Sequence, residues 1–222
     1  MSRPPRTNIG GEVYHVLNRA NARLPIFESE AEYADFQELL REAVERSGTR
    51  LLAYCLMPNH WHLVLWPQYD GELSECMRWL GVTHTNRWHA ARGTTGSGHL
   101  YQGRFKSFVV QGDQHFWSVC RYVECNALRA GLAPNAEAWP WGSAHLRAHG
   151  DPDGWLSPGP LPWPDDWLPW INQPQTEAEL ERLSLSIRRG RPFGAEPWVE
   201  VVSDRFGLVC TLRGRGRPKK GS

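Results

Sequence analysis

Two histidines, His60 and His62, stand one residue apart in the segment MPNHWHLVLWP at residues 57–67. The segment has the apolar character of a β-strand, where alternate side chains share a face. Both imidazoles would therefore project together, and Trp61 would pack as an anchor on the opposite face. Such a pair can chelate a divalent transition metal if further ligands come from elsewhere. On its own the pair leaves a second interpretation open, that of two packed or incidental histidines.

A second segment, RYVECNALRAGL at residues 121–132, places three polar groups at helical spacing. Tyr122, Asn126 and Arg129 fall at positions i, i+4 and i+7, so they would share one helical face. The amide oxygen of Asn126 is a possible neutral metal ligand, and the phenol of Tyr122 would lie one turn away. Ordinary packing is the alternative, because an apolar stripe runs beside these residues on the same helix.

Together the two segments predict a site for phosphoryl transfer. A divalent cation on a phosphodiester oxygen orients the ester and offsets the charge that develops during attack. Tyr122 would be the nucleophile, and its phenol is also a better leaving group than an alkoxide. A tyrosyl phosphate keeps the energy of the ester bond, so strands can be rejoined without ATP. The absence of a Gly-x-x-x-x-Gly-Lys phosphate loop agrees with this expectation.

The hydrophobic pattern predicts the elements that position these residues. Strands are expected at 12–18, 50–57, 60–66 and 104–110, and helices at 29–47, 73–91 and 113–130. Pro58-Asn59 joins the two middle strands as a hairpin turn. This order predicts an α+β fold with a ferredoxin-like antiparallel sheet and helices on one face.

Composition excludes some classes of protein and leaves others open. The chain has 222 residues with 25 Lys+Arg and 24 Asp+Glu, and it has no apolar run long enough to cross a membrane. We therefore expect a cytoplasmic protein without a membrane partner, associated with the nucleoid when it binds DNA. Its five cysteines show no paired C-x-x-C. A zinc-stabilised fold, in which Cys55, Cys120 or Cys125 joins the histidines, is a weaker alternative.

Several motifs in order resemble a known family, the small HUH single-tyrosine transposases (insertion-sequence transposases). The motifs are YHVLNRANARLPIF, AYCLMPNHWHLVL, MRWL, YQGRF and RYVECNALRAGL. Two later segments, RGRPFGAEPWVE and GRGRPKK, are similar to the C-terminal part of the REP-associated tyrosine transposase branch. The resemblance covers most of the chain, and it implies the HUH endonuclease type of α+β fold.

The resemblance also implies roles for particular residues. His60, His62 and Asn126 would bind Mg²⁺ or Mn²⁺, and Tyr122 would be the nucleophile. The family cleaves single-stranded DNA, leaving a 5′-phosphotyrosine link and a free 3′-OH, and the REP-associated branch acts on hairpin-forming palindromes. The usual NPVRAGL of the family is NALRAGL here, so Ala127 replaces a proline that would kink or stiffen the helix.

Basic and aromatic residues outside these motifs are candidates for contacts with DNA, by phosphate binding and base stacking. They are Arg19, Arg23, Tyr101, Arg104, Lys106, Arg129, Arg215, Arg217, Lys219 and Lys220. For the residues near strand ends, a solvated position is an equal alternative. Arg129 has its own alternative, an ion pair with an acid such as Glu124.

Three regions are expected along the chain. An HUH-type domain would span residues 1–132, a Trp- and Pro-rich wrap 133–175, and a helical, basic DNA-binding extension 176–222. The leading hypothesis is a metal-dependent endonuclease and strand transferase that acts on single-stranded DNA with hairpin-forming repeats. The alternative is a non-catalytic protein, derived from a transposase, that binds DNA hairpins. The chain would work as a monomer or a homodimer.

Overall fold

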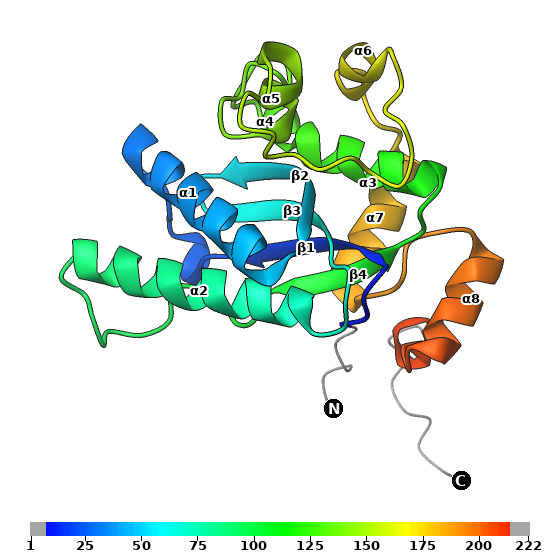
Figure 1. Ribbon diagram of the computed structural model, residues 1–222, viewed down its shortest axis with the longest axis horizontal. Helices are drawn as coiled ribbons and strands as arrows, with labels where there is room; N and C mark the ends of the chain where they lie inside the picture. Colours follow the sequence, from blue (N-terminus) through cyan, green and yellow to red (C-terminus); the bar gives the residue numbers. More distant parts are fainter. Residues whose placement is uncertain (1–7, 214–222) are drawn as a thin grey trace, which may run out of the picture.

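A four-stranded antiparallel sheet lies at the centre of the computed structural model, which describes residues 8–213 (Figure 1). Its strands are β1 (Val13–Arg19), β2 (Arg50–Met57), β3 (His60–Trp66) and β4 (Lys106–Val110). Their order, β2-β3-β1-β4, is that of a ferredoxin-like sheet, as predicted. Strands β2 and β3 have the predicted bounds because Pro58 and Asn59 connect them as a tight turn. Strand β4 begins two residues later than predicted.

Two long helices cover one face of the sheet (Figure 1). Helix α1 (Glu30–Ser47) begins where the Ser29 side chain accepts a hydrogen bond from the amide of Glu32, and it ends at Gly48, whose φ is +72°. Helix α2 (Glu72–Ala91) runs beside it. Between them and the strands lies a core that includes Phe36 and Trp61.

Helices also cover the second face, so the prediction of helices on one face is wrong. Helix α3 (Gln114–Glu124) packs against β2 and β3 on the side opposite to α1 and α2 (Figure 1). The physical reason is visible in β2, where every residue from Leu51 to Met57 is buried. A strand that is apolar on both faces needs a helical layer on each side.

The helix expected at 113–130 is broken, which corrects the prediction of one continuous helix. Helix α3 ends at Glu124, and the short α4 (Asn126–Arg129) follows after Cys125. The side-chain amide of Asn126 donates to the backbone carbonyls of Tyr122 and Val123. A continuous helix would use these carbonyls for backbone amides, so the side chain competes with the helix. The chain bends here although Ala127 stands in place of the family's proline.

The Trp- and Pro-rich segment folds onto the domain and contains two short helices, α5 (Ser143–His149) and α6 (Trp167–Ile171). It also covers the outer edge of β2. The amide of Leu56 donates to the carbonyl of Trp141 (2.9 Å), and the amide of Tyr54 donates to Oγ of Ser143 (2.9 Å). An unpaired strand edge is prone to aggregation, and these contacts protect it.

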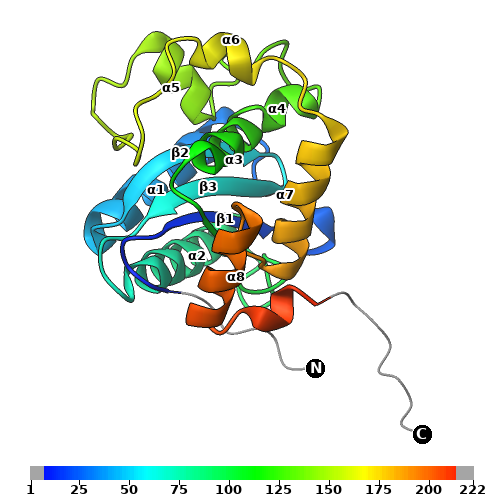
Figure 2. The same ribbon diagram turned by 90° about the vertical axis from the view of Figure 1, so that its right-hand side faces the viewer.

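The last described segment contains α7 (Glu177–Arg189), α8 (Glu196–Arg205) and the short 3₁₀ helix η2 (Val209–Thr211), and another 3₁₀ helix, η1 (Asn21–Arg23), follows β1. Helix α7 lies against the β4 side of the sheet (Figure 2). Phe193 bonds to the backbone of β4, since its amide donates to the carbonyl of Val109 (2.8 Å). Within residues 8–213, no helix is long and apolar enough to cross a membrane. The three regions proposed from the sequence remain a prediction.

Candidate active site

The histidine pair lies on the face of β3 that α3 covers. The ring centroids of His60 and His62 are 5.1 Å apart, and His62 is buried. Trp61 points into the core beneath α1 and α2 with 1% of its surface exposed. Because side chains alternate along a strand, Trp61 packs on one face of β3 and the two imidazoles lie on the other, as expected.

Each imidazole is held through its Nδ1 atom by a neighbouring polar side chain. Nδ1 of His60 lies 2.7 Å from Oδ1 of Asn59, and Nδ1 of His62 lies 2.9 Å from Nε2 of His15. Within residues 8–213, the Nε2 atoms of His60 and His62 have no hydrogen-bond partner. Metal-binding histidines commonly have this arrangement, in which a second group fixes the ring and leaves one nitrogen free.

The imidazoles of this site are neutral at physiological pH. Burial lowers the pKa of His60 to about 4 and the pKa of His15 to about 3, and it brings the pKa of His62 well below its usual value. The positive charges of Arg19 and Arg129 lower the pKa of both His60 and His62 further. A neutral imidazole keeps the lone pair that metal binding requires.

Tyr122 projects from α3 toward the histidines. Its ring centroid lies 5.7 Å from that of His62 in an edge-on arrangement, and the guanidinium of Arg129 lies 4.2 Å from the Tyr122 ring centroid on one face. Burial raises the pKa of the Tyr122 phenol, while the charges of Arg129 and Arg19 lower it. The phenol therefore stays protonated at neutral pH until a positive charge or a base assists it.

Asn126 lies one helical turn after Tyr122 and is 6% exposed. Its Oδ1 accepts a hydrogen bond from Nη2 of Arg129 at 2.5 Å, and its Nδ2 donates to the carbonyl of Tyr122 at 3.0 Å. The Asn126 oxygen, which is the predicted metal ligand, is thus fixed in place by the hydrogen bond that it accepts from Arg129. The helix break at Cys125 gives the side chain this position.

The C-terminal part of the chain reaches this site through Gln175. Its Oε1 accepts from Nη1 of Arg129 (3.2 Å) and from Sγ of Cys125 (3.4 Å). The alternative pairing of Arg129 with Glu124 is wrong, because Glu124 points away and pairs with Arg147 (2.8 Å). Sequence reasoning missed Gln175, since only the fold brings residues 46 positions apart together.

Two further residues of the site, His15 and Asn59, were not predicted. A signal for His15 existed, because a histidine stood among apolar residues on the buried face of the first strand. Asn59 adjoins His60, and its Nδ2 also donates to the carbonyl of Arg23 (3.3 Å). Asn59 therefore links the turn after β1 to the histidine pair.

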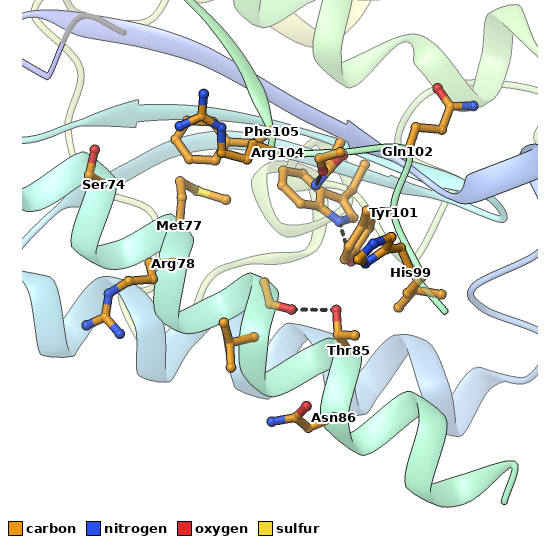
Figure 3. Close-up of a pocket in the computed structure, with 16 residues that line it drawn as sticks. Ser74, Met77, Arg78, Thr85, Asn86, His99, Tyr101, Gln102, Arg104 and Phe105 are labelled. Carbon is orange, nitrogen blue, oxygen red and sulfur yellow. Dashed lines mark hydrogen bonds between the residues drawn. The ribbon is translucent and has the colours of Figure 1, made fainter. Parts of the chain in front are cut away.

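The predicted DNA contacts occupy different positions. Arg19 lies directly opposite His60 in the β1–β3 ladder, on the same face as the histidines. Arg23, Arg104 and Lys106 are exposed. Tyr101 was predicted to be accessible to DNA or solvent, and this prediction is wrong. The side chain is buried, and its hydroxyl accepts a hydrogen bond from Trp61 (Figure 3) and bonds to His84 inside the core. The remaining candidates lie outside the described residues: Arg215, Arg217, Lys219 and Lys220.

Within the described part of the chain, the cysteines form no site with the histidines. Among residues 8–213, no group of three or more histidine, cysteine, aspartate or glutamate side chains is placed to share one ion. Burial also raises the pKa of Cys55 to about 12 and that of Cys120 well above its usual value. These thiols are therefore protonated at neutral pH, and zinc would have to displace the proton to bind them.

Comparisons with known proteins identify a family for this chain and a similar fold. A family model described as "Transposase IS200 like" matches residues 11–126, a range that contains His60, His62, Tyr122 and Asn126. The structure of a REP-associated tyrosine transposase bound to a REP hairpin is similar, with 16% identity and a TM-score of 0.57 over 79% of this chain and 93% of that chain. A proposed transposase from Deinococcus radiodurans R1 is 20% identical over 56% of this chain and 96% of that chain, with a TM-score of 0.38. No curated protein matches the chain.

Proposed function

Because the chain belongs to the IS200-like transposase family, we propose that it is a metal-dependent endonuclease and strand transferase for single-stranded DNA. Its substrate would be a strand with hairpin-forming repeats. The observation that carries this proposal is the position of Tyr122, whose ring edge faces His62 at 5.7 Å while the guanidinium of Arg129 lies over the ring at 4.2 Å. A tyrosine placed between neutral imidazoles and a cation is suited to attack a phosphodiester.

The proposed reaction is a transesterification. Oη of Tyr122 loses its proton to solvent or a neighbouring base and attacks the phosphorus. The bond from phosphorus to the 3′ oxygen breaks, and that oxygen takes up a proton and becomes a free 3′-OH. The DNA then carries a 5′-phosphotyrosine link, and attack by another 3′-OH on this link reverses the step and transfers the strand. No ATP is consumed.

His60, His62 and Asn126 would hold the Mg²⁺ or Mn²⁺ ion. The free Nε2 atoms of the two histidines support this assignment, because Asn59 and His15 occupy the Nδ1 atoms. A bound divalent ion would orient the phosphate and offset the charge that develops on its oxygens. The amide oxygen is a ligand that suits Mg²⁺ or Mn²⁺, and imidazole nitrogens bind transition-metal ions, of which Mn²⁺ is one.

Arg19 and Arg129 would bind the DNA phosphate beside Tyr122. The guanidinium of Arg129 lies 4.2 Å from the Tyr122 ring centroid, and Arg19 lies directly opposite His60 in the sheet. In addition, Nε of Arg19 is buried and has no hydrogen-bond partner among residues 8–213. A phosphate oxygen would satisfy this donor, and guanidinium groups suit phosphate geometry.

The experiment is an adduct assay with labelled DNA. The protein is incubated with end-labelled single-stranded hairpin oligonucleotides and Mn²⁺, and SDS-stable complexes are resolved by electrophoresis. We expect an adduct that requires the metal and is absent from Tyr122→Phe. A chain that binds the hairpins tightly but forms no adduct with any of them would refute the enzymatic proposal.

One observation favours the non-catalytic alternative, in which the chain only binds DNA hairpins. Oδ1 of Asn126, the predicted metal ligand, already accepts a hydrogen bond from Arg129 at 2.5 Å. If this bond persists with DNA, the ion loses one protein ligand. Titration with Mn²⁺ in the presence and absence of a hairpin separates the two functions, because only the enzyme needs saturable metal binding.

A further inference from the structure

The side chain of Arg129 is held at both of its terminal nitrogens, and one of the partners comes from a distant part of the chain. Nη2 donates to Oδ1 of Asn126, and Nη1 donates to Oε1 of Gln175 at 3.2 Å. Among residues 8–213, the bond to Gln175 is the one side-chain hydrogen bond that joins Arg129 to a residue outside α3, α4 and the turn between them. The segment that ends at Gln175 therefore helps to position a cation of the candidate active site.

Arg129 depends on such a partner because its side chain is exposed. An exposed arginine samples many rotamers, and fixing one of them costs conformational entropy. In the structure the guanidinium lies 4.2 Å from the centroid of the Tyr122 ring. The bond at Nη2 alone leaves the guanidinium plane free to rotate, and the second bond at Nη1 restricts that rotation.

The acceptor on Gln175 is neutral, and this decides what charge remains at the site. An amide oxygen accepts the hydrogen bond without cancelling the positive charge of the guanidinium, whereas a carboxylate at this position would pair with it. Arg129 therefore keeps its charge for a phosphate beside Tyr122. The same amide oxygen accepts from Sγ of Cys125 at 3.4 Å, so two donors from one turn hold it.

The backbone on both sides of Gln175 is fixed by other parts of the fold. Arg121 of α3 is 4% exposed, and its Nη2 donates to the carbonyls of Gln173 (2.8 Å) and Pro174 (3.2 Å). On the other side, Thr176 is the N-cap of α7, and its side chain takes part in a capping box. The residues before and after Gln175 are thus held in place, and its side chain extends from a defined point.

The nitrogen of the Gln175 amide has a different environment from its oxygen. Nε2 is buried and has no hydrogen-bond partner among residues 8–213. A buried donor without a partner lowers stability, and an apolar side chain of similar size would avoid this loss. Stability alone therefore does not favour glutamine at this position, whereas the hydrogen bond from Arg129 requires an acceptor.

We propose that Gln175 is a positioning residue for the reaction at Tyr122. Its Oε1 holds the guanidinium of Arg129 over the phenol ring, where the charge faces the phosphate under attack. This inference rests on the proposed function and adds to it a residue from the Trp- and Pro-rich segment. Gln175 does not touch the reacting atoms, so its whole effect on the reaction passes through Arg129.

Gln175→Leu tests the proposal, because leucine removes the acceptor and keeps a side chain of similar volume. Arg129 is exposed, so water can replace the lost acceptor, and the variant should unfold at the same urea concentration as the parent chain. Gln175→Met, which lacks the amide but keeps the length of glutamine, is a second variant. Gln173→Leu is the matched control, because the Gln173 side chain is exposed and forms no hydrogen bond among residues 8–213.

The position of Arg129 is measured by NMR without metal or DNA, in protein that contains isotope-labelled arginine. The ring current of Tyr122 displaces the guanidinium signals of Arg129 upfield, and these signals are identified by their loss in Arg129→Met. Tyr122→Leu gives their value without the ring. In Gln175→Leu we expect the signals to move at least halfway toward that value, and in Gln173→Leu we expect them to stay at the parent value.

The rate of adduct formation measures the effect on the reaction. With hairpin DNA and Mn²⁺, Gln175→Leu should form the adduct about tenfold more slowly, as expected for the loss of one hydrogen bond to a charged group. Gln173→Leu should keep the parent rate. In an Arg129→Met background, Gln175→Leu should have no further effect, because the residue through which it acts is absent.

Two results would overturn the inference. One is an unchanged Arg129 signal in both Gln175→Leu and Gln175→Met. The other is an equal loss of rate on Gln175→Leu substitution in the presence and absence of Arg129, which would show a route that bypasses the arginine. A parent chain that forms no adduct would refute the proposed function instead, and the NMR comparison would decide separately whether Gln175 positions Arg129.

Discussion

Nε2 of His15 on β1 and Nδ1 of His62 on β3 lie 2.9 Å apart in a buried hydrogen bond. The ring of Phe108 packs on His15, with centroids 4.8 Å apart, so His15 has little freedom to move. The hydrogen bond from His15 in turn fixes the ring of His62 through Nδ1 and leaves its Nε2 atom without a partner among residues 8–213. The core of the sheet thus determines the orientation of a candidate metal ligand.

We predict that His15→Leu weakens Mn²⁺ binding about 10- to 100-fold, the usual effect of losing a group that orients a metal ligand. Isothermal titration calorimetry measures this affinity. His15→Gln, whose amide can form the same hydrogen bond, should recover most of it. If His15→Leu remains folded and binds Mn²⁺ as tightly as the parent chain, His15 has no role in positioning His62.

Removing Arg129 should change metal binding and cleavage in opposite directions. Arg129→Met frees Oδ1 of Asn126 and removes a positive charge from the site, so we expect Mn²⁺ to bind about fivefold more tightly, on the order of 1 kcal/mol. Cleavage should fall about 100-fold because the charge beside the phosphate is lost. Titration calorimetry measures the affinity for Mn²⁺, and adduct kinetics measure the cleavage rate. Weaker Mn²⁺ binding together with slower cleavage would contradict this account of Arg129.

Glu124 anchors the Trp- and Pro-rich segment to α3. The carboxylate is buried, and it accepts from Ser143, Arg147 and Trp167. We predict that Glu124→Ala lowers the free energy of unfolding by about 3–5 kcal/mol, because it leaves the half-buried guanidinium of Arg147 without its carboxylate and removes the acceptor of Ser143 and Trp167. Urea denaturation measures this loss. The exposed Glu200→Ala should change stability by less than about 0.5 kcal/mol.

Stability should fall in mild acid through His84, which lies on the other side of the sheet from the candidate metal ligands. Burial lowers its pKa to about 3, so the unfolded chain binds more protons than the folded chain between about pH 6.5 and pH 3. The contribution of His84 is complete above pH 6.5 and is lost by ~1.4 kcal/mol per pH unit below it. Urea denaturation at several pH values should show a shallower slope for His84→Phe. An unchanged slope would show that His84 is not buried in its neutral form.

Local patterns were sufficient for the sheet and for the histidine pair. Alternation and the Pro58-Asn59 turn determine β2 and β3 within the chain itself, so both strands have the predicted bounds. The break at Cys125 could not be predicted from periodicity, because it depends on a side-chain amide that competes for backbone carbonyls. The second helical layer could not be predicted from periodicity, because an unbroken apolar run such as that of β2 indicates a buried strand without specifying which element covers each face.

The rest of the site depends on contacts between distant parts of the chain. Tyr101 was predicted at the surface, yet it bonds to Trp61 and His84, which lie 40 and 17 residues away. Gln175 reaches Arg129 only because the Trp- and Pro-rich segment packs against α3. A single sequence carries no direct signal for such pairs. The position of Asn126 one helical turn after Tyr122, by contrast, could be predicted from their spacing.

The central claim is that Tyr122 forms the bond to DNA, and mass spectrometry of the protein–DNA adduct tests it most directly. The chain is incubated with a cleavable hairpin oligonucleotide and Mn²⁺, and the adduct is digested with nuclease and protease before fragmentation. We predict a nucleotide remnant attached through a 5′ phosphate to the peptide that contains Tyr122, together with a DNA product that ends in a 3′-OH. A remnant on another residue, or an adduct of equal yield from Tyr122→Phe, would contradict the account.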